Sequence, residues 1–103
     1  MSTNKSRARK FLEELRGGPL TFGQMISSLR LADEITQVGL ARKMKISRAH
    51  LCDIENGRRT VSIERAAEFA KVLGYSVNQF VAVALEDQAR EAGLKVKIFM
   101  KAA

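Results

Sequence analysis

The sequence holds one histidine and one cysteine, His50 and Cys52, and they form its only pair of typical metal ligands. Two residues apart on a helix, they would point in different directions. A zinc site needs about three or four ligands, and the sequence has no second cluster. His50 has no serine or cysteine arranged as a nucleophile partner, and no glycine-rich phosphate loop is present. We therefore expect no metal, no cofactor and no enzymatic activity.

The polar residues between Thr36 and Asn56 are better placed for binding than for catalysis. Apolar residues recur there at helical spacing in two short pieces, and Thr36 and Ser47 can each cap one piece. Gly57 follows, where a helix would stop through a left-handed residue. The exposed face would carry Gln37, Arg42, Lys43, Arg48, His50 and Asp53. A helix-turn-helix that places its second helix in the DNA major groove needs this layout.

This stretch resembles the phage-repressor and Cro-like helix-turn-helix regulators, also called the xenobiotic-response-element family. The resemblance covers roughly residues 21–80. Two positions depart from the family pattern: Gly39 stands where a Glu is common, and Lys45 stands in the turn where Gly is favoured. If Lys45 has a positive φ, its backbone is strained. The matching pieces are Thr36-Gln37, Leu40-Ala41, Ile46-Ser47, Ile54-Glu55-Asn56-Gly57 and Ala70-Lys71-Val72-Leu73-Gly74.

The resemblance implies which side chains reach DNA. Base edges are read from the start of the second helix, which here carries Arg48, Ala49 and Asp53, with His50 nearby. Arg48 can offer two donors to a guanine, or it can contact phosphate instead. Asp53 can accept from a cytosine amine or hold Arg48 in place. The implied phosphate contacts are Gln37, Ser47, Asn56, Arg58 and Arg59.

Two further residues are interpreted from the same resemblance. Arg30 ends the first helix, where the family often contacts the DNA backbone. Glu55 is expected to be structural and to face a basic group within the fold. Cys52 has no basic neighbour at helical spacing, so we expect an inert, half-buried thiol.

The distribution of charge favours a polyanionic partner. The formal net charge is +7, and residues 1–16, 30–59 and 94–103 each carry a net +3. Residues 60–93 carry a net −2, so the basic excess lies on the two ends and on the helix-turn-helix. An excess placed in this way is typical of proteins that bind double-stranded DNA.

Cap and periodicity signals predict five helices over residues 21–33, 37–43, 48–56, 63–73 and 76–92. The expected fold is therefore all-α, a repressor-like domain over residues 21–93. Residues 1–20 would form a basic N-terminal extension, which could be an arm that reaches DNA or a solvated leader packed through Phe11 and Leu12. Residues 94–103 would form a C-terminal dimerisation strand.

The predicted strand rests on alternation. Leu94 to Lys101 alternates apolar and mostly basic residues, which is the period of a β-strand. A lone strand leaves its amides and carbonyls unpaired, so it needs a partner. The simplest partner is the same strand of a second copy, across a two-fold axis, which predicts a homodimer.

These features predict a sequence-specific DNA-binding transcriptional regulator, a repressor that acts as a homodimer on a palindromic operator. The alternative is an antitoxin that binds a toxin protein and also its own operator. A single cysteine cannot form an internal disulfide, residues 1–10 lack the apolar run of a signal peptide, and no stretch is long enough to cross a bilayer. A cytoplasmic protein without a membrane partner is therefore expected.

Overall fold

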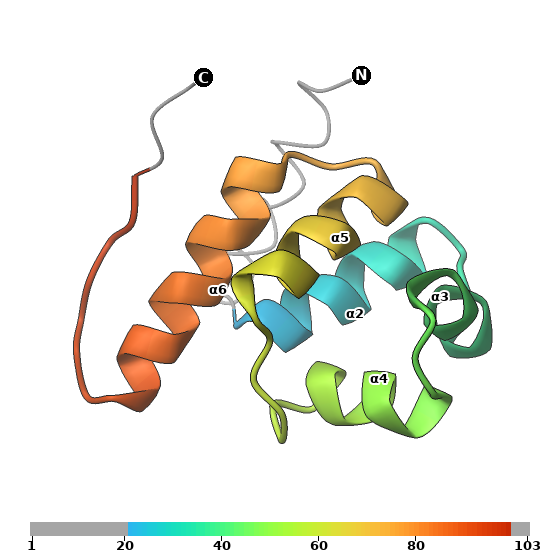
Figure 1. Cartoon of the computed structure of the whole chain (residues 1–103), viewed down its shortest axis with the longest axis horizontal. Helices are drawn as coiled ribbons and strands as arrows, with labels where there is room; N and C mark the ends of the chain where they lie inside the picture. The colour runs from blue at the N-terminus through green and yellow to red at the C-terminus, as the bar shows by residue number, and fades with distance from the viewer. Residues whose placement is uncertain (1–20, 100–103) are drawn as a thin grey trace.

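The computed structural model describes residues 21–99 as five helices packed around one hydrophobic core (Figure 1). They are α2 (Phe22–Ala32), α3 (Gln37–Met44), α4 (Arg48–Glu55), α5 (Ile63–Leu73) and α6 (Val77–Glu91). Each end lies within about one residue of its predicted position, the usual latitude of a helix boundary. Over residues 21–93 the fold is all-helical, as expected. The predicted N-terminal extension, residues 1–20, lies outside the described residues.

Side-chain caps set where these helices begin. At every start a threonine or serine hydroxyl accepts the backbone N–H three residues on. The capping box is complete at Thr21, where the Gln24 side chain also accepts the Thr21 N–H at 3.2 Å. The capping residues are Thr21, Thr36, Ser47, Ser62 and Ser76.

The turn between α3 and α4 takes a left-handed conformation although it contains no glycine. Lys45 ends α3 in the left-handed conformation, with φ of 58°. A side chain is disfavoured there because its Cβ crowds the backbone, so the strain expected for Lys45 is present. Glu34, in the turn after α2, has a φ of 57° that nothing in the sequence pattern indicated.

Aromatic side chains join the first helix to the last two. The Phe22 ring meets those of Phe69 and Phe80 edge to face, at centroid distances of 5.8 and 6.1 Å. All three side chains are buried. Asp87 of α6 accepts the backbone N–H of Phe22 at 3.1 Å, so α6 also caps the first turn of α2. Among the described residues, no helix has the length and apolar character needed to cross a membrane.

Gly23 allows α2 to touch the end of α4. A Cβ at this position would overlap the carbonyl oxygen of Ile54 and lie 2.8 Å from that of Glu55. Both obstructing atoms are backbone, which cannot move aside without shifting α4. The absence of a side chain at Gly23 therefore fixes how closely the two helices approach.

The predicted C-terminal strand is wrong for the part of it that the structure describes. Residues 94–99 form no strand, and Met100 and Lys101 lie outside the described residues. The tail turns back beside α6 instead (Figure 1). The N–H of Leu94 donates to the Ala89 carbonyl and that of Ile98 to the buried Glu86 carboxylate, both at 2.8 Å. A strand needs a paired backbone, and here α6 supplies the acceptors.

We predict that Gly23→Ala lowers the free energy of unfolding by about 1–3 kcal/mol, because the added methyl overpacks two backbone carbonyls. Urea unfolding followed by circular dichroism measures this change. Gly39→Ala is the matched control, since a Cβ there meets the Thr36 hydroxyl at 3.0 Å and no backbone atom. Alanine is otherwise the better helix former by about 1 kcal/mol, so stabilisation by Gly23→Ala would contradict the close approach.

Candidate nucleic-acid interface

The helix-turn-helix presents α4 at the outside of the molecule. Leu40 and Met44 of α3 and Leu51 and Ile54 of α4 are buried in the core, which leaves the opposite faces of these helices open. A short turn joins the two helices, and the N–H of Ile46 donates to the Ala41 carbonyl at 3.0 Å. Figure 1 shows α4 at the edge of the bundle, away from α6. A groove of DNA can therefore approach it without obstruction from the described residues.

Two of the predicted base-reading residues lie exposed at the start of α4. They are Arg48 and Ala49, which occupy the first turn. Within residues 21–99, Arg48 makes no hydrogen bond or ion pair, so its guanidinium donors are available to a ligand. The alternative in which Asp53 holds Arg48 is wrong, because Asp53 instead accepts from Nε of Arg58 at 3.0 Å.

His50 is held towards its neutral form. Partial burial lowers its pKa, and the nearby Arg59 and Arg65 lower it further by repelling a third positive charge, against the opposing effect of Asp53. The pKa therefore lies below the ordinary histidine value of 6.5. At neutral pH the ring offers one N–H donor and one acceptor rather than a cation.

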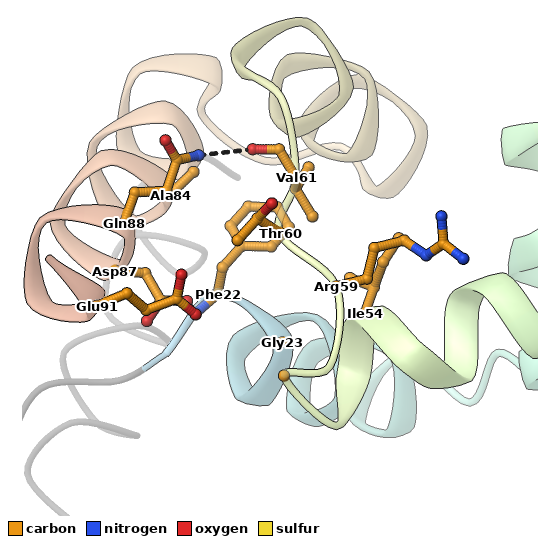
Figure 2. A pocket seen from close by; sticks show the side chains of 11 residues that line it. Phe22, Gly23, Ile54, Arg59, Thr60, Val61, Ala84, Asp87, Gln88 and Glu91 are labelled. Atoms are coloured by element: carbon orange, nitrogen blue, oxygen red, sulfur yellow. Dashed lines mark hydrogen bonds between the residues drawn. The ribbon is translucent and has the colours of Figure 1, made fainter.

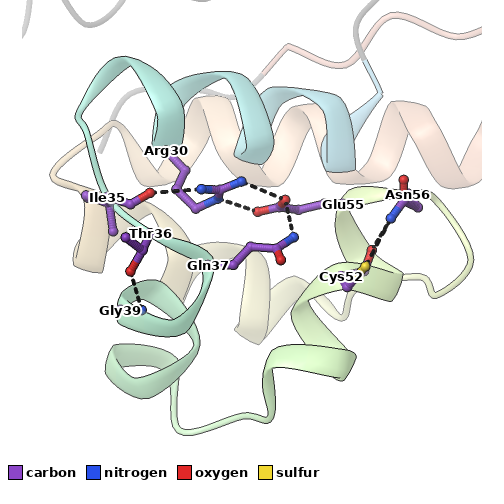
Figure 3. A network of polar contacts seen from close by, with 8 residues as sticks. All are labelled: Arg30, Ile35, Thr36, Gln37, Gly39, Cys52, Glu55 and Asn56. Atoms are coloured by element: carbon purple, nitrogen blue, oxygen red, sulfur yellow. Dashed lines mark hydrogen bonds and ion pairs between the residues drawn. The ribbon is translucent and has the colours of Figure 1, made fainter.

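The predicted phosphate contacts Asn56, Arg58 and Arg59 lie together after α4, all exposed. The Asn56 side-chain amide donates to the Cys52 carbonyl at 2.8 Å and lies 3.3 Å from its sulfur (Figure 3). Arg58 brings Nη2 within 3.9 Å of the same sulfur. The half-buried Cys52 thus has a basic neighbour after all, one that helical spacing could not indicate because it comes from the loop.

A buried ion pair joins α2 to the inner side of α4. Arg30 of α2 donates from Nε and Nη2 to the two carboxylate oxygens of Glu55 of α4, at 2.8 and 3.2 Å (Figure 3). The two side chains are only 9% and 4% exposed. The structural role expected for Glu55 is confirmed. The DNA-backbone contact expected for Arg30 is wrong, because its guanidinium is turned inward to this carboxylate.

Two more residues complete this network. Arg30 also donates from Nη1 to the Ile35 carbonyl at 2.9 Å, and the Gln37 side-chain amide donates to Glu55 at 3.0 Å. Gln37 is the first residue of α3, so one carboxylate connects α2, α3 and α4. Gln37, a predicted phosphate contact, is thereby held at a fixed place beside the helix start.

A small cleft lies between the start of α2, the loop before α5, and α6 (Figure 2). Its lining includes Phe22, Asp87 and Glu91. Gln88 closes one side by donating to the Val61 carbonyl at 2.8 Å. The cavity volume of about 20 Å³ suits roughly one water molecule, whereas small-molecule sites start at about 300 Å³. This cleft is too small to hold an effector.

We predict that Glu55→Gln lowers the free energy of unfolding by about 3–5 kcal/mol, because it leaves the buried Arg30 charge without its counterion. Thermal and urea unfolding measure the loss. Arg58→Ala is the matched control, since it breaks an exposed ion pair and should cost less than about 1 kcal/mol. Equal losses of unfolding free energy in the two variants would show that the buried ion pair stabilises the fold no more than the exposed one.

Comparison with known proteins agrees with this geometry. The sequence model of the helix-turn-helix family matches residues 26–80. The chain is 39% identical over 62 residues to the immunity repressor protein of Bacillus phage phi105, over 60% of this chain and 43% of that protein. It is 36% identical over 56 residues to the control protein C.BamHI of Bacillus amyloliquefaciens, over 53% of this chain and 69% of that one. The match thus spans less than half of the phage repressor.

The chain is also similar to a protein of known structure. The chain is similar to the clp gene regulator ClgR of Corynebacterium glutamicum, with a TM-score of 0.55 and 30% sequence identity. The similarity covers 70% of this chain and 77% of that one. Together with the open face of α4 and the family match, this shows that the chain belongs to the phage-repressor-like helix-turn-helix family of DNA-binding transcriptional regulators.

Proposed function

We propose that the protein is a sequence-specific repressor that inserts α4 into the major groove of an operator in double-stranded DNA. The observation that carries this proposal is the exposed first turn of α4, where Arg48 has no partner among the described residues. A long cation left unengaged on a rigid helix is suited to an external acceptor. The names of the relatives, an immunity repressor, a control protein and a gene regulator, support the same proposal.

Roles follow from position on the interface. Arg48 offers two donors to the acceptor edge of a guanine, and Ala49 presents a methyl suited to thymine. Arg59 contributes charge to a neighbouring phosphate. The proposed set of DNA contacts is the one expected from the sequence: Gln37, Ser47, Arg48, Ala49, His50, Asp53, Asn56, Arg58 and Arg59.

Selection of bound duplexes from a random pool, at stated salt, should enrich one short sequence. We predict that Arg48→Ala weakens binding to that sequence by about 1–3 kcal/mol more than binding to random DNA, with relaxed preference at one base pair. Arg59→Ala is the control and should weaken both alike while flattening the salt dependence. If Arg48→Ala weakened binding to the selected sequence and to random DNA equally, Arg48 would contact only phosphate. No enrichment by the unchanged protein would overturn the repressor proposal.

We further propose that the repressor binds as a homodimer to a palindromic operator. One recognition helix reads a short half-site, and a dimer engages two half-sites about 34 Å apart. The tail supplies the contact surface, since Leu94, Val96 and Phe99 are 57%, 42% and 85% exposed. Burying such side chains against a second copy would remove apolar surface from water.

We predict that Val96→Asp combined with Phe99→Asp converts a dimer to a monomer, because charges at a buried apolar contact are costly. Sedimentation measures the mass at micromolar concentration. Leu31→Asp, at an exposed leucine distant from the tail in sequence, is the control and should leave the dimer intact. A monomeric unchanged protein would refute the dimer. In the antitoxin alternative, the last helix, the tail or the N-terminal extension binds a toxin protein. The names of the relatives given above describe regulators and mention no toxin.

A further inference from the structure

The turn that ends α4 holds a loop residue, Arg58, beside Asp53. Gly57 takes the left-handed conformation, with φ of 76°. Its N–H donates to the Ile54 carbonyl at 3.1 Å, and the N–H of Arg58 donates to the Asp53 carbonyl at 2.9 Å. This pair of bonds is a Schellman motif, which turns the chain back over the last helical turn. The backbone of Arg58 is thereby fixed beside Asp53.

The side chains of Arg58 and Asp53 are also bonded to each other. Nε of Arg58 donates to Oδ1 of Asp53 at 3.0 Å, and Nη2 lies 3.9 Å from the Cys52 sulfur. Both partners remain accessible, with side-chain exposures of 63% for Arg58 and 36% for Asp53. An exposed pair of this kind adds little stability, so its main physical effect is to restrict where the guanidinium points.

The bond holds the Arg58 guanidinium beside Asp53, which lies on the proposed base-reading face of α4. Asp53 is four residues after Ala49, so the two lie on the same face of α4. The Schellman motif reverses the chain after the end of α4, and the bond to Asp53 then ties the Arg58 side chain to this face of the helix. With Nε engaged by Asp53, the terminal amino groups still carry N–H donors that can face outward.

We infer that Arg58 reads a guanine in the operator and that Asp53 is its positioning residue. The outer N–H groups of Arg58 meet the O6 and N7 acceptors of the base while the carboxylate holds Nε. This inference rests on the proposed function. It replaces the phosphate contact expected for Arg58, and it replaces the direct cytosine contact open to Asp53, whose Oδ1 is already engaged.

Two conservative variants separate base reading from a phosphate contact. Arg58→Lys keeps the charge but loses the planar paired donors, and Asp53→Asn keeps the shape but loses the carboxylate. Each should reduce discrimination at one and the same base pair by roughly 5- to 150-fold. Because the two residues act as a unit, the double variant should lose about as much as either single one. Duplex selection and binding to single-base operator variants provide the measurement.

Arg59→Lys is the matched control, because it makes the same change at the neighbouring loop position and should leave base preference unaltered. Circular dichroism checks that each variant keeps its helices. A phosphate role for Arg58 gives a different pattern. Base preferences stay unchanged in Arg58→Lys, and Asp53→Asn strengthens binding to all sequences by removing a negative charge. That pattern would overturn the inference while leaving the repressor proposal standing, whereas no enrichment by the unchanged protein would overturn both.

Discussion

The ion pair between Arg30 and Glu55 constrains the angle between α4 and the rest of the fold. A carboxylate buried to this depth is tolerated only with its hydrogen bonds satisfied, and Arg30 and Gln37 supply three of them. The acceptor lies at the last residue of α4 and the donors come from α2 and α3. A change in the angle between these helices would leave charge unpaired in the interior. The pair therefore penalises alternative arrangements of the helix-turn-helix.

Such a constraint is needed because α3 and α4 are short. Each has eight residues, fewer than an isolated helix needs to be stable in water. Their order comes from packing on α2 and from the ends, which Thr36, Ser47 and the turn at Gly57 close. The absence of a side chain at Gly23 brings α2 against the carbonyls where α4 finishes. The end of α4 is thus fixed by steric contact and by charge together, while its first turn projects outward.

The helix starts and the stop at Gly57 depend on local chemistry and were therefore predictable from the sequence. Helix starts could be placed because hydroxyl caps act within three residues, and the left-handed stop at Gly57 follows from its lack of a side chain. The partners of Arg30, Asp53 and Gly23 could not be predicted. Arg30 meets Glu55 twenty-five residues away, and Arg58 reaches Asp53 only through a reversed turn, whereas helical spacing describes neighbours three or four apart. The strand predicted for the tail was wrong for a related reason. Alternation of apolar and polar residues indicates a strand, but it cannot show whether a neighbouring strand or a helix will supply the hydrogen-bond partners of the backbone.

The separation between the buried network and the exposed first turn of α4 has an evolutionary consequence. Within the described part of the chain, Arg48 and Ala49 are exposed, so substituting them should change the free energy of folding little. Under the proposed function, the same substitutions change which DNA sequence is bound. Proteins sit close to the stability threshold below which mutations are purged. If α4 reads DNA as proposed, a lineage with this architecture reaches new operators through single substitutions, each of which leaves a protein that still folds. Divergent specificity among relatives that share one scaffold is the expected result.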